Sequence, residues 1–125
     1  MKFCEIVWPD SDIENINIEY NCAILTIWNY ALKKKLFVKC SGFAGITNLC
    51  IFDDTTIVNA KVFSADEKND PFVINLCTAY DKSYDYGGRI LSDGVLELRI
   101  ELTNRICFSL YCQEIEVLEY NPIQT

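Results

Sequence analysis

The sequence predicts one all-β or β-dominated domain over residues 1–125, an antiparallel meander of about eight to ten short strands that forms a barrel or a sandwich. Three observations predict this fold class. Apolar and polar side chains alternate along most of the chain, which is the period of a half-buried strand. Turn residues interrupt the alternation at short intervals. Half of the residues are apolar and 13% are aromatic, which is enough for one buried core.

Four strands are expected in the first part of the chain, over residues 3–8, 16–20, 23–30 and 36–40. Turn residues separate them at 9–12, 21–22 and 33–35. Trp28 and Leu25 fall on opposite faces of the strand 23–30, and both are apolar. We therefore expect this strand to be central in the sheet, with apolar neighbours on both sides.

The uncharged segment 41–52 contains Gly42 and Gly45 within an otherwise strand-like pattern. Glycine at such positions indicates a bulge, a bend or a close approach of two backbones. A turn at Asp53-Asp54, a strand over 55–64 and a polar loop over 65–70 are expected next.

A short helix is expected near residues 70–80, and it is the only helix that the pattern indicates. Asp70 has the chemistry of an N-cap and Pro71 suits the first helical position. Apolar side chains also recur there at every fourth residue. A strand is the alternative, because several residues of this segment are β-branched.

The clearest β pattern lies towards the C-terminal end. The sequence predicts a turn at 92–94, a strand over 95–102, a turn at 103–104, a returning strand over 106–112 and a last strand over 114–120. Leucine and isoleucine alternate with charged residues in 95–102, so we expect Glu97, Arg99 and Glu101 to face water.

The chain contains seven cysteines and no histidine. Histidine is the usual general base and the commonest metal ligand, so we expect no catalytic residues, no metal site and no cofactor. The odd number and irregular spacing of the cysteines favour buried free thiols over disulfides or a zinc site. Cys107 and Cys112 are expected to point to opposite faces of one strand.

We expect a cytoplasmic protein. Free thiols suit a reducing compartment. Residues 1–5 carry an acid where a signal peptide needs an apolar run. The uncharged stretches are too short to cross a bilayer, so no contact with a membrane is expected.

The net charge of −7 is concentrated in the second half of the chain. Residues 1–62 carry a balance of −1, whereas residues 63–125 carry −6. An acidic half repels nucleic acid and favours a basic protein partner. Ordinary solubility is the alternative explanation of this charge.

The segment 80–89 is the most site-like part of the sequence, because it combines tyrosines, acids and glycines without apolar periodicity. Tyrosine-rich loops with small polar neighbours are typical of binding surfaces. The candidate partner contacts are Asp81, Tyr84, Asp85 and Tyr86, with Glu97 and Glu101 as a second acidic stripe. The alternative is a hairpin connection whose tyrosines pack back onto the domain.

Several short segments carry a resemblance to a known group of proteins. They are Phe43-x-Gly45-Ile46, Phe52-Asp53-Asp54, and the hairpin 98–102 with Phe108 and Cys112. In these segments, and in size, acidity and hairpin pattern, the chain resembles small acidic bacterial immunity-type and uncharacterised β proteins of polymorphic toxin systems. The resemblance implies binding to a toxin domain and blocking of its active site, and it assigns no further site residues.

The favoured function is therefore non-enzymatic protein binding, most concretely neutralisation of a basic toxin. The alternative is a small β-barrel that binds an apolar small-molecule ligand. Its cavity would be lined by Trp8, Trp28, Phe37 and Phe43. A third explanation, a structural or assembly subunit, predicts a stable homo-oligomer.

Overall fold

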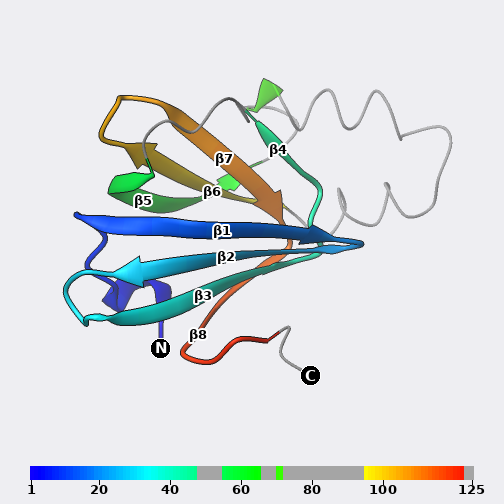
Figure 1. Ribbon diagram of the computed structural model, residues 1–125. Helices are drawn as coiled ribbons and strands as arrows, with labels where there is room; N and C mark the ends of the chain where they lie inside the picture. The colour runs from blue at the N-terminus through cyan, green and yellow to red at the C-terminus, as the bar shows by residue number, and fades with distance from the viewer. Residues whose placement is uncertain (48–54, 66–69, 72–94, 123–125) are drawn as a thin grey trace, which may run out of the picture.

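The computed structural model describes residues 1–47, 55–65, 70–71 and 95–122 (Figure 1). Its strands are β1 (Ser11–Glu19), β2 (Cys22–Asn29), β3 (Lys34–Ser41), β4 (Gly45–Thr47), β5 (Thr56–Ala65), β6 (Val95–Leu102), β7 (Cys107–Cys112) and β8 (Glu114–Leu118). They form one sheet of eight strands in the order β4-β7-β6-β5-β1-β2-β3-β8, and every pair is antiparallel. The predicted β-dominated, antiparallel fold is confirmed.

The sheet curls until its two ends meet. β7 is second in the strand order and β8 is last, yet only Gln113 separates them along the chain (Figure 1). β3 pairs with β8, and the short β4 that follows β3 pairs with β7. The Gln113 amide donates to the Ser41 carbonyl at 2.9 Å, and the Ala44 amide donates to the Tyr111 carbonyl at 2.7 Å. Two bent segments therefore close the sheet, as in the barrel form of the prediction.

The bend requires glycine at position 42. Gly42 has a φ of +64°, in the left-handed region that side chains disfavour. A Cβ atom at this position would lie 2.8 Å from the Cβ of Gln113, well inside van der Waals contact. The predicted bulge or bend at Gly42 is therefore confirmed.

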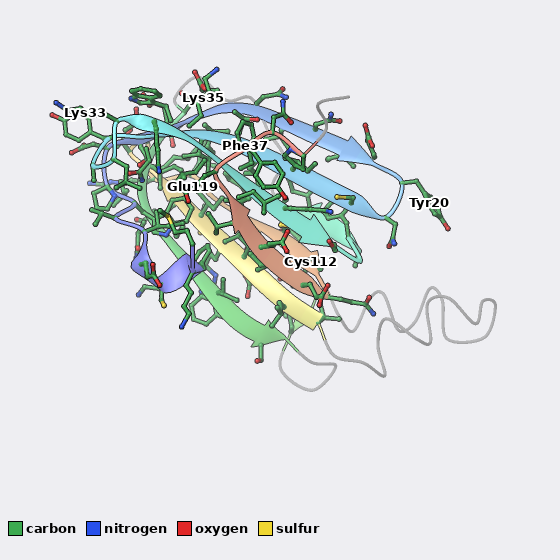
Figure 2. All side chains as sticks on the ribbon, turned by 90° about the horizontal axis from the view of Figure 1, so that it is seen from below. Tyr20, Lys33, Lys35, Phe37, Cys112 and Glu119 are labelled. Carbon is green, nitrogen blue, oxygen red and sulfur yellow. The ribbon has the colours of Figure 1, made fainter. Side chains whose placement is uncertain are left out.

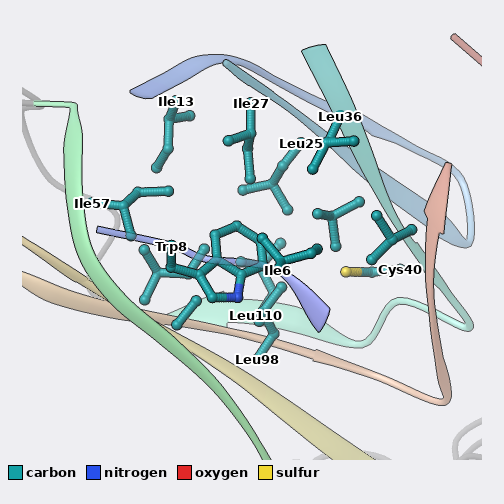
Figure 3. Packing of buried hydrophobic residues seen from close by; sticks show 14 of the residues in the cluster. Ile6, Trp8, Ile13, Leu25, Ile27, Leu36, Cys40, Ile57, Leu98 and Leu110 are labelled. Atoms are coloured by element: carbon teal, nitrogen blue, oxygen red, sulfur yellow. The ribbon is translucent and has the colours of Figure 1, made fainter. Parts of the chain in front are cut away.

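The core fills the concave side of the curled sheet (Figure 3). Its largest fully buried apolar side chains are Leu25, Ile27, Leu36, Ile57, Leu98, Ile100, Leu102, Phe108 and Leu110. They come from five strands and follow the predicted alternation, so each of these strands presents one face to the core. Burying a side chain of this size stabilises a fold by roughly 1.5–3 kcal/mol.

The predicted strand over 3–8 is wrong. Phe3–Glu5 forms a 3-10 turn, and the chain that follows buries Ile6 and Trp8 in the core. Successive turns of a 3-10 helix place residues three apart on one side, so Phe3 and Ile6 reach the same apolar surface. The ring centroids of Phe3 and Trp8 lie 5.1 Å apart. An apolar run of this length satisfies either pattern, and packing against the core decides between them.

A buried asparagine holds one end of the fold together. The Asn29 side chain donates to the carbonyl of Val7 at 3.0 Å and to the hydroxyl of Ser11 at 3.2 Å, and it accepts from the Leu32 amide at 2.9 Å. It therefore connects the N-terminal segment, the start of β1 and the β2–β3 turn, and it fixes the backbone beside Trp28.

The strand over 95–102 is confirmed, and β1 begins at Ser11, earlier than the expected 16–20. The cysteines within the described ranges are free thiols, but only Cys40 and Cys112 are buried as expected, whereas Cys4 is exposed. Cys107 and Cys112 lie on opposite faces of β7 as expected. The expected helix of 70–80 lies outside the described residues except at its first two positions. Among the residues that the structure describes, no helix has the length and apolar character needed to cross a membrane.

Candidate functional site

The convex side of the sheet presents two surfaces of different chemistry. The outer side chains of β5, β6 and β7 form a surface that we call the network face. The outer side chains of β1, β2, β3 and β8 form a second surface, called the acidic face.

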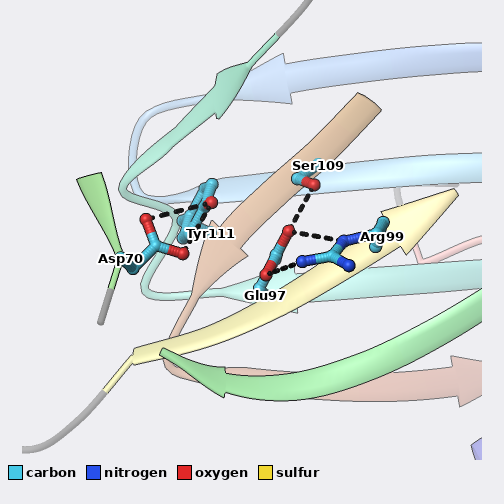
Figure 4. A network of polar contacts seen from close by, with 5 residues as sticks. All are labelled: Asp70, Glu97, Arg99, Ser109 and Tyr111. Atoms are coloured by element: carbon cyan, nitrogen blue, oxygen red, sulfur yellow. Dashed lines mark hydrogen bonds and ion pairs between the residues drawn. The ribbon is translucent and has the colours of Figure 1, made fainter. Parts of the chain in front are cut away.

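The network face is built around a buried carboxylate (Figure 4). Glu97 is only 5% exposed and lies between its cross-strand neighbours Phe63 and Tyr111. Its carboxylate accepts two hydrogen bonds from Arg99, from Nε and Nη2 at 3.0 Å each. A third comes from the Ser109 hydroxyl at 2.6 Å. Three donors around one carboxylate compensate for its removal from water.

The expectation that Glu97 faces water is therefore wrong, whereas Arg99 and Glu101 are exposed as expected. Glu97 does point to the convex side, but its neighbours on β5 and β7 cover it. Glu97 and Glu101 consequently do not form a joint exposed stripe. The other candidate contacts, Asp81, Tyr84, Asp85 and Tyr86, lie outside the described residues. A partner-binding role for all six stays a prediction.

Tyr111 extends the network to a distant part of the chain. Its hydroxyl donates to the carboxylate of Asp70, at 3.0 Å to Oδ2 and 3.3 Å to Oδ1 (Figure 4). Burial, and then this hydrogen bond, raise the pKa of Tyr111 well above its usual value. Tyr111 is therefore protonated at neutral pH and acts as a donor. Its carboxylate partner is the residue that the sequence indicates as a helix N-cap.

Arg99 links the network to an open groove. Its guanidinium carbon lies 4.4 Å from the centroid of the Phe63 ring, in a cation–π contact. Bonding to Glu97 raises the pKa of Arg99 further above its ordinary value, so the group is permanently charged. The groove has a volume of about 190 Å³. Its walls are Asn59, Lys61, Phe63, Arg99, Glu101 and Cys107.

The acidic face has an apolar centre. Ile24 and Phe37 are each 7% exposed there, and Trp28, next to the last residue of β2, is 36% exposed. Trp28 lies opposite Asp12 on one side and Lys35 on the other. Phe37, labelled in Figure 2, belongs to β3, the strand that pairs with β8.

Carboxylates dominate the surroundings of this apolar centre. The acidic residues are Asp12, Glu14, Glu19, Glu114 and Glu116, and the basic residues are Lys35 and Lys39. Lys35 lies 3.4 Å from Glu14, so one of the two lysines is already paired. The face therefore combines an aromatic residue accessible to a partner with an excess of negative charge.

Two of the four residues expected to line a ligand cavity lie on the convex side. Trp28 and Phe37 belong to the acidic face, whereas Trp8 lies in the core and Phe43 packs against it. These four side chains do not surround one space. The sequence pattern already separates Trp28 from the inward-facing Leu25, and the other residues of the acidic face come from strands distant in sequence.

Among the described residues, no group of three or more cysteine, aspartate or glutamate side chains gathers as a metal site would require. Comparisons with protein-family models, with curated proteins and with solved structures find no match to this chain. The chemistry of the two convex surfaces is therefore the guide to function.

Proposed function

We propose that this domain binds a basic protein without catalysing a reaction, and that the acidic face is its docking surface. The observation that carries this proposal is Trp28, which is 36% exposed on β2, between β1 and β3, on a sheet face where acidic residues outnumber basic ones. Tryptophan is among the residues that contribute most to binding energy when it lies centrally in an interface.

The charge of the face supports a basic partner. Long-range attraction between complementary surfaces accelerates encounter and falls with added salt. Glu114 and Glu116 lie on β8 at the margin of the face, and both are exposed. Carboxylates at such positions influence the association rate and its salt dependence more than the final contact.

A toxin domain is the partner class that the immunity-type resemblance implies. Nucleases in particular need a cationic surface, because their substrate is a polyanion. An acidic protein that covers such a surface would exclude the substrate. This part of the proposal rests on the resemblance and on charge complementarity.

The experiment is capture of partners from a lysate of the native host with the immobilised domain, washed at low and at high salt. We expect one basic protein in near-stoichiometric amount, released at high salt. Trp28→Ala should lower the retained amount strongly, and the double variant Glu114→Gln/Glu116→Gln should lower it at moderate salt. Tyr20→Ala and Glu5→Gln are the controls, because both residues are exposed and lie outside the acidic face.

Two outcomes would contradict the proposal. Retention that is equal for wild type and Trp28→Ala would remove the acidic face from the interface. Loss of the partner with Glu101→Gln but not with the double variant on β8 would instead assign binding to the network face, where Glu101 is exposed.

A further inference from the structure

We infer that the groove on the network face is a binding site for a small carboxylate. This site is separate from the acidic face, and the inference does not depend on the proposed function. Its walls come from three adjacent strands, β5, β6 and β7, whose pairing is continuous there. Side chains on rigid strands hold a ligand more accurately than side chains on loops.

Arg99 is preorganised to receive an anion. One edge of its guanidinium, through Nε and Nη2, is bound to the buried Glu97, and its central carbon lies over the ring of Phe63. These contacts fix a side chain that is otherwise rich in rotamers, so binding a ligand costs less conformational entropy. Arg99 is still 48% exposed, so part of this fixed cation faces the solvent-filled groove.

Lys61 and Asn59 add donors beside it. Lys61 lies directly opposite Arg99 in the β5–β6 ladder, and no carboxylate of the described chain forms an ion pair with it. The side-chain Oδ1 of Asn59 accepts a hydrogen bond from the Ala60 amide at 2.9 Å, which leaves the NH₂ group of Asn59 to donate to a ligand. Two cations and one amide therefore line a space of about 190 Å³.

The remaining walls select among anions. Glu101 is exposed in the same groove, and its charge opposes a dianion such as phosphate more than a monoanion. Desolvation raises the pKa of Cys107, so this wall is a neutral thiol at neutral pH. Phe63, 38% exposed, offers an apolar surface. A monoanionic carboxylate with an apolar body satisfies these walls best.

The test is a titration followed by NMR, with 3-phenylpropionate as the probe and inorganic phosphate as the competing anion. We expect saturable shifts of the Arg99 Nε–Hε signal and of amides in β5 and β6. For a probe of this size the dissociation constant should be roughly millimolar. Phosphate should bind more weakly than 3-phenylpropionate. Glu101→Gln should reduce this difference in affinity, because it removes the negative charge that opposes the dianion.

Lys61→Gln should weaken binding of the probe about tenfold, because it removes one charge-assisted contact. Lys39→Gln removes the same charge from the acidic face and should leave the affinity unchanged. The spectra themselves report whether each variant is folded, and Asn59→Ala offers a second substitution in the groove. Absence of saturable shifts, or equal weakening by Lys61→Gln and Lys39→Gln, would overturn the inference. Tighter binding of phosphate than of the carboxylate would overturn the assigned ligand class.

Discussion

Replacement of Arg99 by methionine tests the network face most sharply. Methionine keeps most of the length and the apolar stem of arginine, but it removes both donors to Glu97. The Glu97 carboxylate is 5% exposed, so water does not replace these donors fully. The hydrogen bond from Ser109 at 2.6 Å remains.

The size of the expected loss of stability follows from the burial of the two partners, Glu97 and Arg99. Breaking a fully buried ion pair costs about 3–5 kcal/mol. The Arg99 side chain is 48% exposed, so solvent screening reduces this value, and we expect a loss of about 2 kcal/mol. For a domain of this size the melting temperature should fall by roughly 6–10 °C.

Urea unfolding followed by circular dichroism measures this loss, with Arg105→Met as the matched control. Arg105 is exposed, and its replacement should change the free energy of unfolding by less than about 0.5 kcal/mol. The double variant Glu97→Gln/Arg99→Met should be more stable than Arg99→Met alone, because it no longer buries an uncompensated charge. A cost for Arg99→Met below about 0.5 kcal/mol, or no recovery in the double variant, would refute the reasoning.

Three further predictions follow from the fold. Gly42→Ala should destabilise the domain by about 1–3 kcal/mol in urea unfolding. The double variant Gly42→Ala/Gln113→Gly should recover the stability lost to the clash with Gln113, but not the stability lost to the positive φ of residue 42. Because the folded state raises the pKa of Tyr111, its contribution to stability is complete below the ordinary tyrosine pKa of about 10 and is lost as the pH rises above it. Tyr111→Phe should flatten this alkaline decline, and an unchanged decline would contradict the assignment. An apolar dye should give no saturable change in tryptophan fluorescence, since the inner space is packed with buried side chains; a saturable change would favour the apolar-ligand alternative.

The strands of the two clearest hairpins could be predicted from the sequence because their alternation is regular. Leu98, Ile100 and Leu102 are buried as the pattern requires, and Gly42 marks the bend. Alternation reports which face of a strand a residue occupies. It predicts which residues are buried only where the outer face of the sheet is exposed to water.

The environment of Glu97 could not be predicted for that reason. Its side chain points to the convex side as expected, but Phe63, Ser109 and Tyr111, all distant in sequence, surround it there. Closure of the sheet is equally non-local, because it depends on β7 and β8 pairing with different neighbours on either side of Gln113. The acidic face assembles from four strands, so no local pattern predicts it, and the sequence places Trp28 only among the residues expected to line a ligand cavity.

The most direct test of the proposed function is the dissociation constant of the captured basic partner, measured for wild type, Trp28→Ala and Tyr20→Ala. Loss of the Trp28 contact should weaken binding by more than about tenfold, while the control leaves it unchanged. The wild-type constant should also rise with salt concentration. Equal constants for wild type and Trp28→Ala would contradict docking at the acidic face.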